Sequence, residues 1–324
     1  MNASSDGMGQ HPVPAVPAPA TPTGAGAPAT GAPAAAPRET FIHLPIFFGV
    51  LLLAAIGFVL FQSGGLGHRS VAEMADTVPI GQGVTGVRFE IESGTVNVAP
   101  GDERAAAYTL GVMRAADTAE DLARLEATAY ALQVVPDLAR PSILVLRGPR
   151  MPPNTTGLLG LVLNVRLPKE LELEVVVTGS GHITVGDRVA RMDIATGRGD
   201  LRFEHCQCAI KAVTGRGYVI ADGHRGDLNI ETLNGDMQVF ARQPGKLLQL
   251  VTGRGTVQCE VPENLDFVLD ARAEEGRIGS AFGLTSERVG TYGAVMVGQN
   301  GSGTTKVVLR TGKGHVAFRS KKFD

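Results

Sequence analysis

The chain has 324 residues, a formal net charge of −2, 42 glycines and no tryptophan, and aromatic residues make up only 5% of it. Nearly balanced charge, without a long run of Lys or Arg, argues against nucleic-acid binding. Three cysteines are too few, and odd in number, for a disulfide scaffold, so they do not indicate a redox compartment.

Residues 1–40 consist mainly of Pro, Ala, Gly and Thr, with almost no charged or large apolar side chains. Such a segment cannot bury enough apolar surface to offset its ordering entropy, and its prolines favour extended conformations. We expect a disordered tail that acts as a spacer or stalk, in preference to a specific proline-motif ligand.

Residues Leu44–Phe61 carry no charge. Eighteen helical residues span about 27 Å, close to the thickness of a bilayer's hydrocarbon core, and Phe41 and Ile42 can lengthen the helix. Some forty residues precede the run and no A-x-A pattern follows it, which favours an uncleaved transmembrane helix over 41–62 instead of a signal peptide. Arg38 and Arg69 nearly cancel, so charge does not decide the orientation.

Residues 63–84 are expected to be a linker and residues 85–170 a β-rich cap with one short helix. The helix should begin after Thr118, whose hydroxyl can cap free backbone N–H groups, and run to about Leu132. Alternating or continuous apolar patterns predict strands in the cap at Val87–Val98, Ser142–Arg147 and Leu158–Arg166.

The strongest signal is an internal repeat, T-G-x-G or a close variant, spaced by 18, 18, 18 and 20 residues. Its clear copies begin at Thr178, Thr196, Thr214, Thr232 and Thr252, and weaker copies occupy 273–276 and 311–314. Because glycine allows positive φ, each copy predicts a tight corner.

Apolar residues recur at fixed distances from these corners, which predicts two inward-facing strands per coil. The residues five positions after the first residue of each corner are Ile183, Leu201, Val219, Met237, Val257, Ile278 and Val316. Among the residues seven positions after that first residue, only Ser280 is not apolar. Repeats that cannot close a core alone form a continuous one when they stack. We therefore expect an all-β, right-handed parallel β-solenoid with coils of about 18–20 residues, regular over 171–324.

The recurrent T-G-x-G corners, the segment GKLLQLVTGRGTVQCEVPENLDF and the closing NGSGTTKVVLRTGKGHVAF resemble the bacterial "putative-adhesin" family over about residues 85–324. This resemblance implies an extracytoplasmic β-solenoid domain with no established enzyme activity or cofactor. With the membrane helix expected over 41–62, the chain should be a single-pass protein of the cell membrane, and the resemblance implies that its C-terminal domain lies outside the cytoplasm.

The x position of the corners should bring cationic residues into one row, with Arg198 next to Arg216, Arg254 two coils further on, and Lys313 in a later copy. Ser180, Asn234 and Glu275 occupy the same position. A row of guanidinium groups can bind phosphate or carboxylate, which makes this a candidate anion-binding site. The alternative is that solvated cations merely keep the corner soluble.

Other candidate chemistry is weaker. Cys206 and Cys208, with His205, have a spacing that could hold a metal or form a reactive pair, but buried or turn cysteines are the preferred interpretation. Cys259 should lie too far from Cys206 for a disulfide. Scattered carboxylates could serve a polysaccharide-cleaving groove, although no pair is distinguished by a base or nucleophile. They are Asp193, Asp200, Asp222, Asp227 and Asp236.

These patterns favour a membrane-anchored, non-enzymatic structural or interaction protein of the cell envelope, with no cofactor. The alternatives are an envelope-stress sensing or signalling component and, third, a polysaccharide-active enzyme. The partner, an envelope polymer or a protein, and the oligomeric state do not follow from the sequence.

Overall fold

The computed structural model of the protein describes residues 67–101, 103–128 and 131–322. All of them belong to one compact unit, Phe47–Asp324. The expected tail (1–40) and membrane helix (41–62) lie outside the described residues. Within the described ranges, no helix combines the length and the apolar character needed to cross a bilayer.

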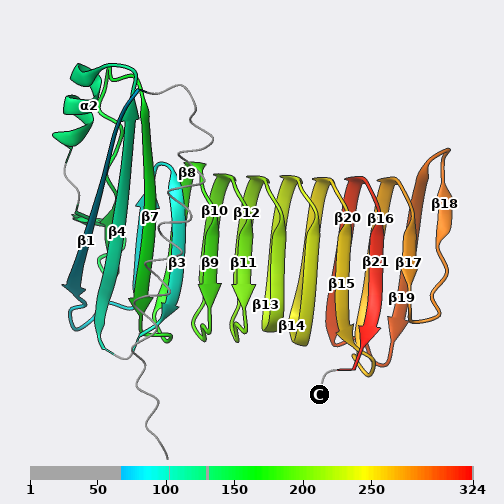
Figure 1. Ribbon diagram of the computed structural model, residues 1–324. Coiled ribbons are helices and arrows are strands. Elements are labelled where there is room, and N and C mark those ends of the chain that lie inside the picture. Colours follow the sequence, from blue (N-terminus) through cyan, green and yellow to red (C-terminus); the bar gives the residue numbers. More distant parts are fainter. Residues whose placement is uncertain (1–66, 102, 129–130, 323–324) are drawn as a thin grey trace, which may run out of the picture. The chain divides into compact units, whose positions relative to one another are not determined.

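The described chain opens with three long antiparallel strands, drawn at the left of Figure 1. β1 (His68–Pro79) pairs with β4 (Ala105–Ala116), which pairs in turn with β7 (Leu158–Leu167). β1 occupies most of the segment that the sequence marked as a linker. It is an edge strand with mostly exposed side chains, so it lacks the alternation by which a half-buried strand is recognised.

The predicted helix is present as α2 (Ala119–Glu126). Its start is confirmed, because the Thr118 hydroxyl accepts the Asp121 backbone N–H at 3.1 Å, as an N-cap should. Leu125 is buried on the side that packs against the sheet. The helix ends at Glu126, earlier than the expected Leu132, because only this short apolar face has a surface to cover.

Parallel coils begin before residue 171, within the segment expected to be a cap. β2 (Gly86–Ile91) pairs in parallel with β6 (Ile143–Arg147) and β8 (Glu172–Ser180). β3 (Gly94–Pro100) likewise pairs with β7 and β9 (Ile183–Gly186). The coil β2–β3 therefore lies between two coils that follow it in the chain. β5 (Gln133–Pro136) is antiparallel to β6 at one edge.

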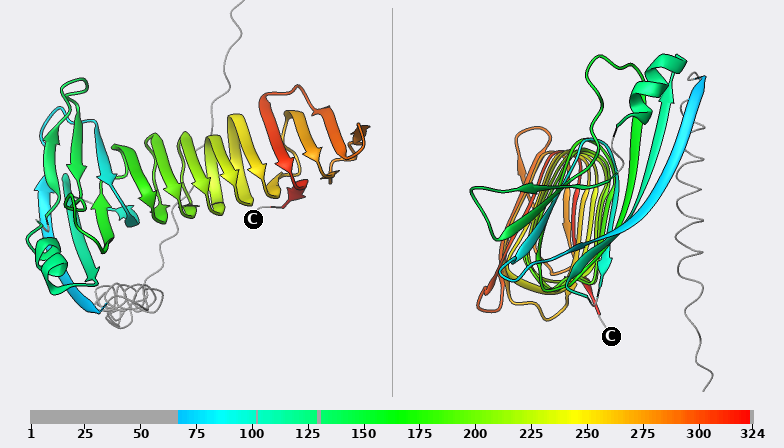
Figure 2. Two further views of the ribbon diagram at one scale, coloured as in Figure 1. Left: turned by 90° about the horizontal axis from the view of Figure 1, so that it is seen from above. Right: turned by 90° about the vertical axis from the view of Figure 1, so that its left-hand side faces the viewer.

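From β8 onwards the coils stack one above another in parallel register (Figures 1 and 2). Leu201 is paired with Val219, and Val219 with Met237, and all three are buried, which confirms the predicted inward column. The strands are β10 (Met192–Arg198), β11 (Leu201–Glu204), β12 (Ile210–Arg216), β13 (Val219–Asn234), β14 (Met237–Arg254) and β15 (Val257–Pro262).

The repeated threonines form a ladder inside the corner. Thr214 Oγ1 lies 3.1 Å from the Gly199 carbonyl oxygen of the adjacent coil, and Thr252 Oγ1 lies 3.0 Å from that of Gly235. These hydroxyls thus satisfy buried turn backbone, whereas that of Thr232 is buried without a hydrogen-bond partner. The first copy differs from the expectation, because Val177 and not Thr178 stands opposite Thr196, with a shift of register before Ser180. An extra residue in β8 leaves Thr178 exposed.

The last coils do not stack in chain order. β20 (Thr305–Lys313) pairs with β14 on one side and β16 (Phe267–Glu275) on the other. β21 (Val316–Lys321) likewise lies between β15 and β17 (Ile278–Ser280). The C-terminal coil is therefore inserted between two earlier ones. The irregular stretch 281–300 forms β18 (Glu287–Val289) and β19 (Gly293–Asn300), and β19 is antiparallel to β16.

Candidate functional site

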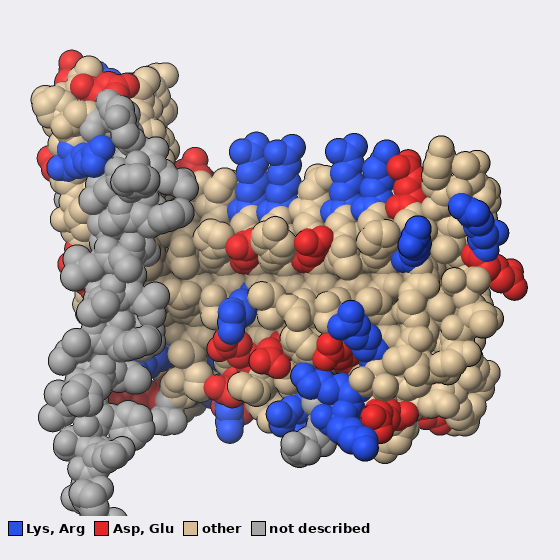
Figure 3. Space-filling model, turned by 45° about the vertical axis from the view of Figure 1, so that its right-hand side comes forward, with Lys and Arg blue, Asp and Glu red and all other residues tan. Residues whose placement is uncertain are grey.

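The x residues of the corners stand in one continuous row, which we call the corner row. The strand registers give its order as Ser180, Arg198, Arg216, Asn234, Arg254, Lys313 and Glu275. Arg198 and Arg216 are neighbours, as expected. Because the C-terminal coil is inserted, Lys313 lies directly beside Arg254. Figure 3 shows Lys and Arg side chains gathered along this edge of the stack.

The corner row projects because the backbones on either side of it stack closely. Arg198 and Arg216 are each flanked by two glycines. A Cβ at Gly199 or Gly217 would overlap the carbonyl of the equivalent glycine in the preceding coil. The x side chain is then the only one at the corner that can extend into solvent. All four cationic residues of the row are exposed.

The arginines of the corner row have no acidic partner. Among the described residues, Arg198, Arg216 and Arg254 form no side-chain hydrogen bond or ion pair, whereas Lys313 Nζ lies 3.0 Å from Glu275 Oε2. Neighbouring coils are about 4.8 Å apart, so two adjacent cations repel each other by roughly 0.9 kcal/mol in water before screening. An anion that lies between two guanidinium groups removes this repulsion and accepts charge-assisted hydrogen bonds.

Residues 164–319 match the family model described as Toastrack DUF4097. We call this part of the chain the Toastrack domain, after the family model that it matches. The match confirms the resemblance inferred from the repeats, over a shorter range than the expected 85–324. It contains every cationic position of the corner row.

Two solved structures share 11% sequence identity with the chain. One is a "putative cell adhesion protein from Clostridium sporogenes ATCC 15579", with a TM-score of 0.35 over 78% of this chain and 100% of that one. The other is a "Putative lipid binding protein from Parabacteroides distasonis ATCC 8503", with a TM-score of 0.31 over 80% of this chain and 98% of that one. No curated protein matches the chain.

Three carboxylates at corners of the Toastrack domain accept hydrogen bonds from turn backbone. Asp200 Oδ1 accepts the Tyr218 backbone N–H and Asp236 Oδ1 that of Thr256, each at 2.7 Å. Asp227 Oδ1 accepts the N–H groups of Lys246 and Leu247. Asp193 lies in β10 and Asp222 in β13, at outward positions. The structure therefore does not bring the five aspartates together as a catalytic group.

The cysteines of the Toastrack domain are all free and buried. Burial raises the pKa of Cys206 to about 11 and that of Cys208 to about 12, and it also raises the pKa of Cys259. In the described part of the chain, no three His, Cys, Asp or Glu side chains are grouped to hold a metal ion. The thiols are thus core residues in a low-polarity setting.

Alkylation should report this burial. At pH 8, iodoacetamide should label Cys206, Cys208 and Cys259 at least about 100-fold more slowly in the folded protein than in urea, because the reactive thiolate is scarce. The control is Ser286→Cys, at an exposed position, which should react rapidly without urea. Rapid labelling of the native cysteines would contradict the structure. Mass spectrometry identifies the modified residues.

Two buried polar residues near the corner opposite the corner row were not identified from the sequence. Arg188 is fully buried, and its guanidinium donates to the backbone carbonyls of Leu167 and Leu171. His224 is 1% exposed, and its Nε2 lies 3.3 Å from the Asp227 carbonyl. Neither lies in the apolar columns from which the coils were predicted, so the sequence pattern did not point to them.

Burial holds the pKa of His224 below its ordinary value of 6.5, chiefly by desolvation. The unfolded chain then binds a proton more readily than the folded one. The free energy of unfolding should therefore be constant above about pH 6.5 and should fall as the pH decreases below it. Urea titrations between pH 5 and 8 test this. His224→Gln should flatten the slope, and His68→Gln, at an exposed position, should not; an unchanged slope in His224→Gln would contradict the prediction.

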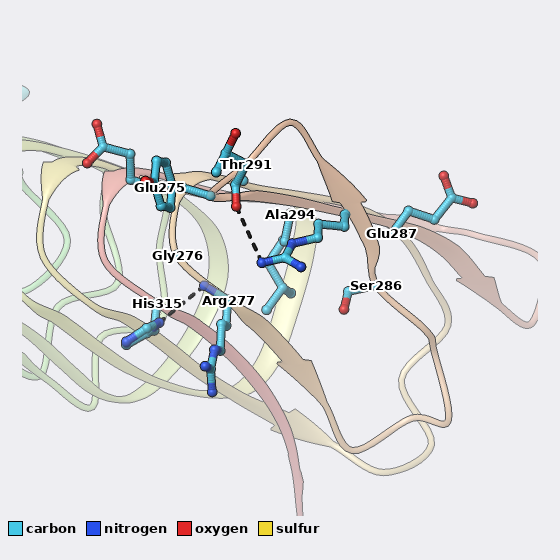
Figure 4. Close-up of a pocket in the computed structure, with 12 residues that line it drawn as sticks. Glu275, Gly276, Arg277, Ser286, Glu287, Thr291, Ala294 and His315 are labelled. Carbon is cyan, nitrogen blue, oxygen red and sulfur yellow. Dashed lines mark hydrogen bonds between the residues drawn. The ribbon is translucent and has the colours of Figure 1, made fainter.

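A cavity of about 650 Å³ lies at the far end of the Toastrack domain, between the last coil and the turn that joins β18 to β19. Figure 4 shows that the carboxylates of Glu275 and Glu287 extend away from it on opposite sides. His315 Nδ1 accepts the Arg277 backbone N–H at 3.2 Å, so the imidazole is used structurally. The residues do not converge on one point, and the corner row remains the stronger candidate site.

Proposed function

We propose that the chain is a membrane-anchored, non-enzymatic interaction protein of the cell envelope. In this proposal the apolar run 41–62 is the anchor, the tail 1–40 is cytoplasmic, and the Toastrack domain, a right-handed solenoid, faces outward. The observation that carries the interaction role is the corner row, in which Arg198, Arg216 and Arg254 are exposed and have no acidic partner. Stacked coils hold these cations at a fixed spacing, as a recognition surface requires.

The absence of catalysis is part of the proposal. Its support is that Asp200, Asp227 and Asp236 accept backbone N–H groups, which leaves their carboxylates committed to turns. A polysaccharide-active enzyme would need a pair of carboxylates in a groove. Incubation of the full-length protein with isolated envelope glycans should release no new reducing ends. Release of reducing ends would contradict the proposal and support the enzyme.

Protease treatment of intact cells tests the location. An added protease should cleave the Toastrack domain of the full-length chain without lysis, and the cell membrane fraction should retain the chain. Deletion of 41–62 should release the chain from that fraction. Protection of the domain until lysis would overturn the outward orientation, and retention of the deletion variant would overturn the anchor.

The signalling alternative makes a different prediction for the tail. If the domain senses the state of the envelope, deletion of 1–40 should alter a transcriptional response while protease accessibility at the surface stays unchanged. In the interaction protein proposed here, the same deletion should leave transcription unaltered.

A further inference from the structure

We infer that the corner row binds a linear anionic polysaccharide that runs along the stacking axis, across the coils. The inference deepens the proposed function by naming the partner of its interaction surface. It rests on three features of the described chain: the spacing of the four cations, the lack of acidic partners at the three arginines, and the exposed groups beside them.

The spacing suits a polymer with regularly repeated charges. The registers place Arg198 next to Arg216 and Arg254 next to Lys313, with Asn234 between the two pairs. At about 4.8 Å per coil, the four steps from the first to the last cation cover roughly 19 Å. A single anionic group can contact only two adjacent cations, whereas a chain with charges at intervals can contact both pairs at once and gain from multivalency.

The arginines of the corner row differ from several other exposed arginines of the solenoid in having no acidic partner. Three of these others are neutralised: Arg202 pairs with Glu204 at 2.5 Å, and Arg272 and Arg310 each pair with Asp270 at 3.0 Å. Acidic neighbours thus neutralise some outward arginines, whereas Arg198, Arg216 and Arg254 stay available to a ligand. A ligand's carboxylates or phosphates can take the place of those neighbours.

The groups beside the row favour a sugar polymer over a bilayer. Tyr218, two residues after Arg216, has 59% of its surface exposed, and an exposed aromatic ring can pack on the apolar face of a sugar. The Asn234 amide can both donate to and accept from hydroxyl groups. The cations also form a single file, which matches a linear polymer better than the flat surface of a membrane.

Binding of polygalacturonate, a linear polymer with one carboxylate per sugar, tests the inference. The full-length chain is held in nanodiscs of zwitterionic lipid, and binding is measured at 50 and 200 mM salt. The combined variant R198Q/R216Q/R254Q should bind about 30-fold more weakly, with a salt dependence reduced by roughly two to three cations. The control R202Q/R272Q/R310Q loses the same net charge from paired positions and should bind nearly as the wild type does.

Two single substitutions separate a sugar-binding row from a general cation effect. Tyr218→Ala should weaken binding about fivefold, whereas Tyr292→Ala, at an exposed position near the far end of the solenoid, should not. Asn234→Arg should tighten binding and raise its salt dependence, because it joins the two cation pairs. Monomeric galacturonate and neutral dextran should not compete at concentrations that saturate the polymer site.

Three results would overturn the inference. They are equal loss of binding in the triple variant and its control, effective competition by the monomer, and row-dependent binding to phosphatidylglycerol vesicles as tight as that to the polymer. The last would assign the row to a membrane. Failure of the chain to enter nanodiscs would contradict the proposed membrane anchor and not the polysaccharide site. The same binding measurements would then be made on the chain in buffer.

Discussion

Gly217→Ala is expected to lower the free energy of unfolding by at least about 3 kcal/mol. Gly217 has a φ of +149°, which side-chain-bearing residues rarely adopt, and an added Cβ would overlap the Gly199 carbonyl of the adjacent coil. The neighbour cannot yield, because it is backbone held by the next coil in turn. Since domains of this size are stable by roughly 5–15 kcal/mol, urea denaturation should show a large shift of the midpoint.

Gly186→Ala provides the matched control. Gly186 ends strand β9, and a Cβ built there would meet no atom within 4 Å. This substitution should change the free energy of unfolding by less than about 0.5 kcal/mol. Equal effects at the two glycines would show that the corners do not stack as the structure has them.

Phe318→Ala should have a comparable effect, about 3–5 kcal/mol. Phe318 is fully buried in β21, with its ring centroid 5.1 Å from that of Phe267 and 4.9 Å from that of Phe282. These contacts join the inserted C-terminal coil to the last coil. The substitution leaves a cavity where the two meet and removes both aromatic contacts.

Arg319→Ala is the control for Phe318→Ala, since Arg319 is the next residue and its side chain is exposed. Urea denaturation of the control should match that of the wild type to within about 0.5 kcal/mol. A small effect of Phe318→Ala would mean that the three rings do not form one cluster. Hydrogen exchange of β16, β20 and β21 would then show no loss of protection either.

The repeat could be predicted from the sequence because the residues that specify each coil lie within that coil. Corner glycines and apolar residues at fixed offsets specify both strands of a coil, and equal spacing specifies register, as the column Leu201, Val219 and Met237 confirms. Even Ser280, the one polar residue of the second column, has a local explanation. Its Oγ accepts the Phe282 backbone N–H, and Phe282 supplies the apolar group that Ser280 lacks.

The order of coils at the ends could not be predicted. Every coil of this kind presents nearly the same edge, so the residues of β14 could accept either β16 or β20 as a neighbour. The hairpin β18–β19 determines the order, because β19 pairs with one edge of β16 and leaves only the other edge free for β20. At the other end, the corner of β2–β3 reads Glu92-Ser93-Gly94 and lacks the repeat that would have revealed it.

The corner row was largely visible in the sequence, since Arg198, Arg216, Arg254 and Lys313 all occupy the x position. What the sequence could not supply was the adjacency of Lys313 to Arg254, which depends on the inserted coil, and the pairing of other arginines with acids. Tyr218 was missed as well, because a single exposed aromatic residue has no periodic signature.

The interleaved ends also constrain how the domain is made. The strands at 305–321 are synthesised last, yet they fill a place between strands that have already left the ribosome. Until they arrive, the edges of β14 and β16 that pair with β20 in the folded domain lack this partner. The growing chain thus keeps unpaired strand edges until its final twenty residues are made. Premature stop codons in that stretch would leave these strand edges permanently unpaired and able to pair with other chains, a known route to aggregation.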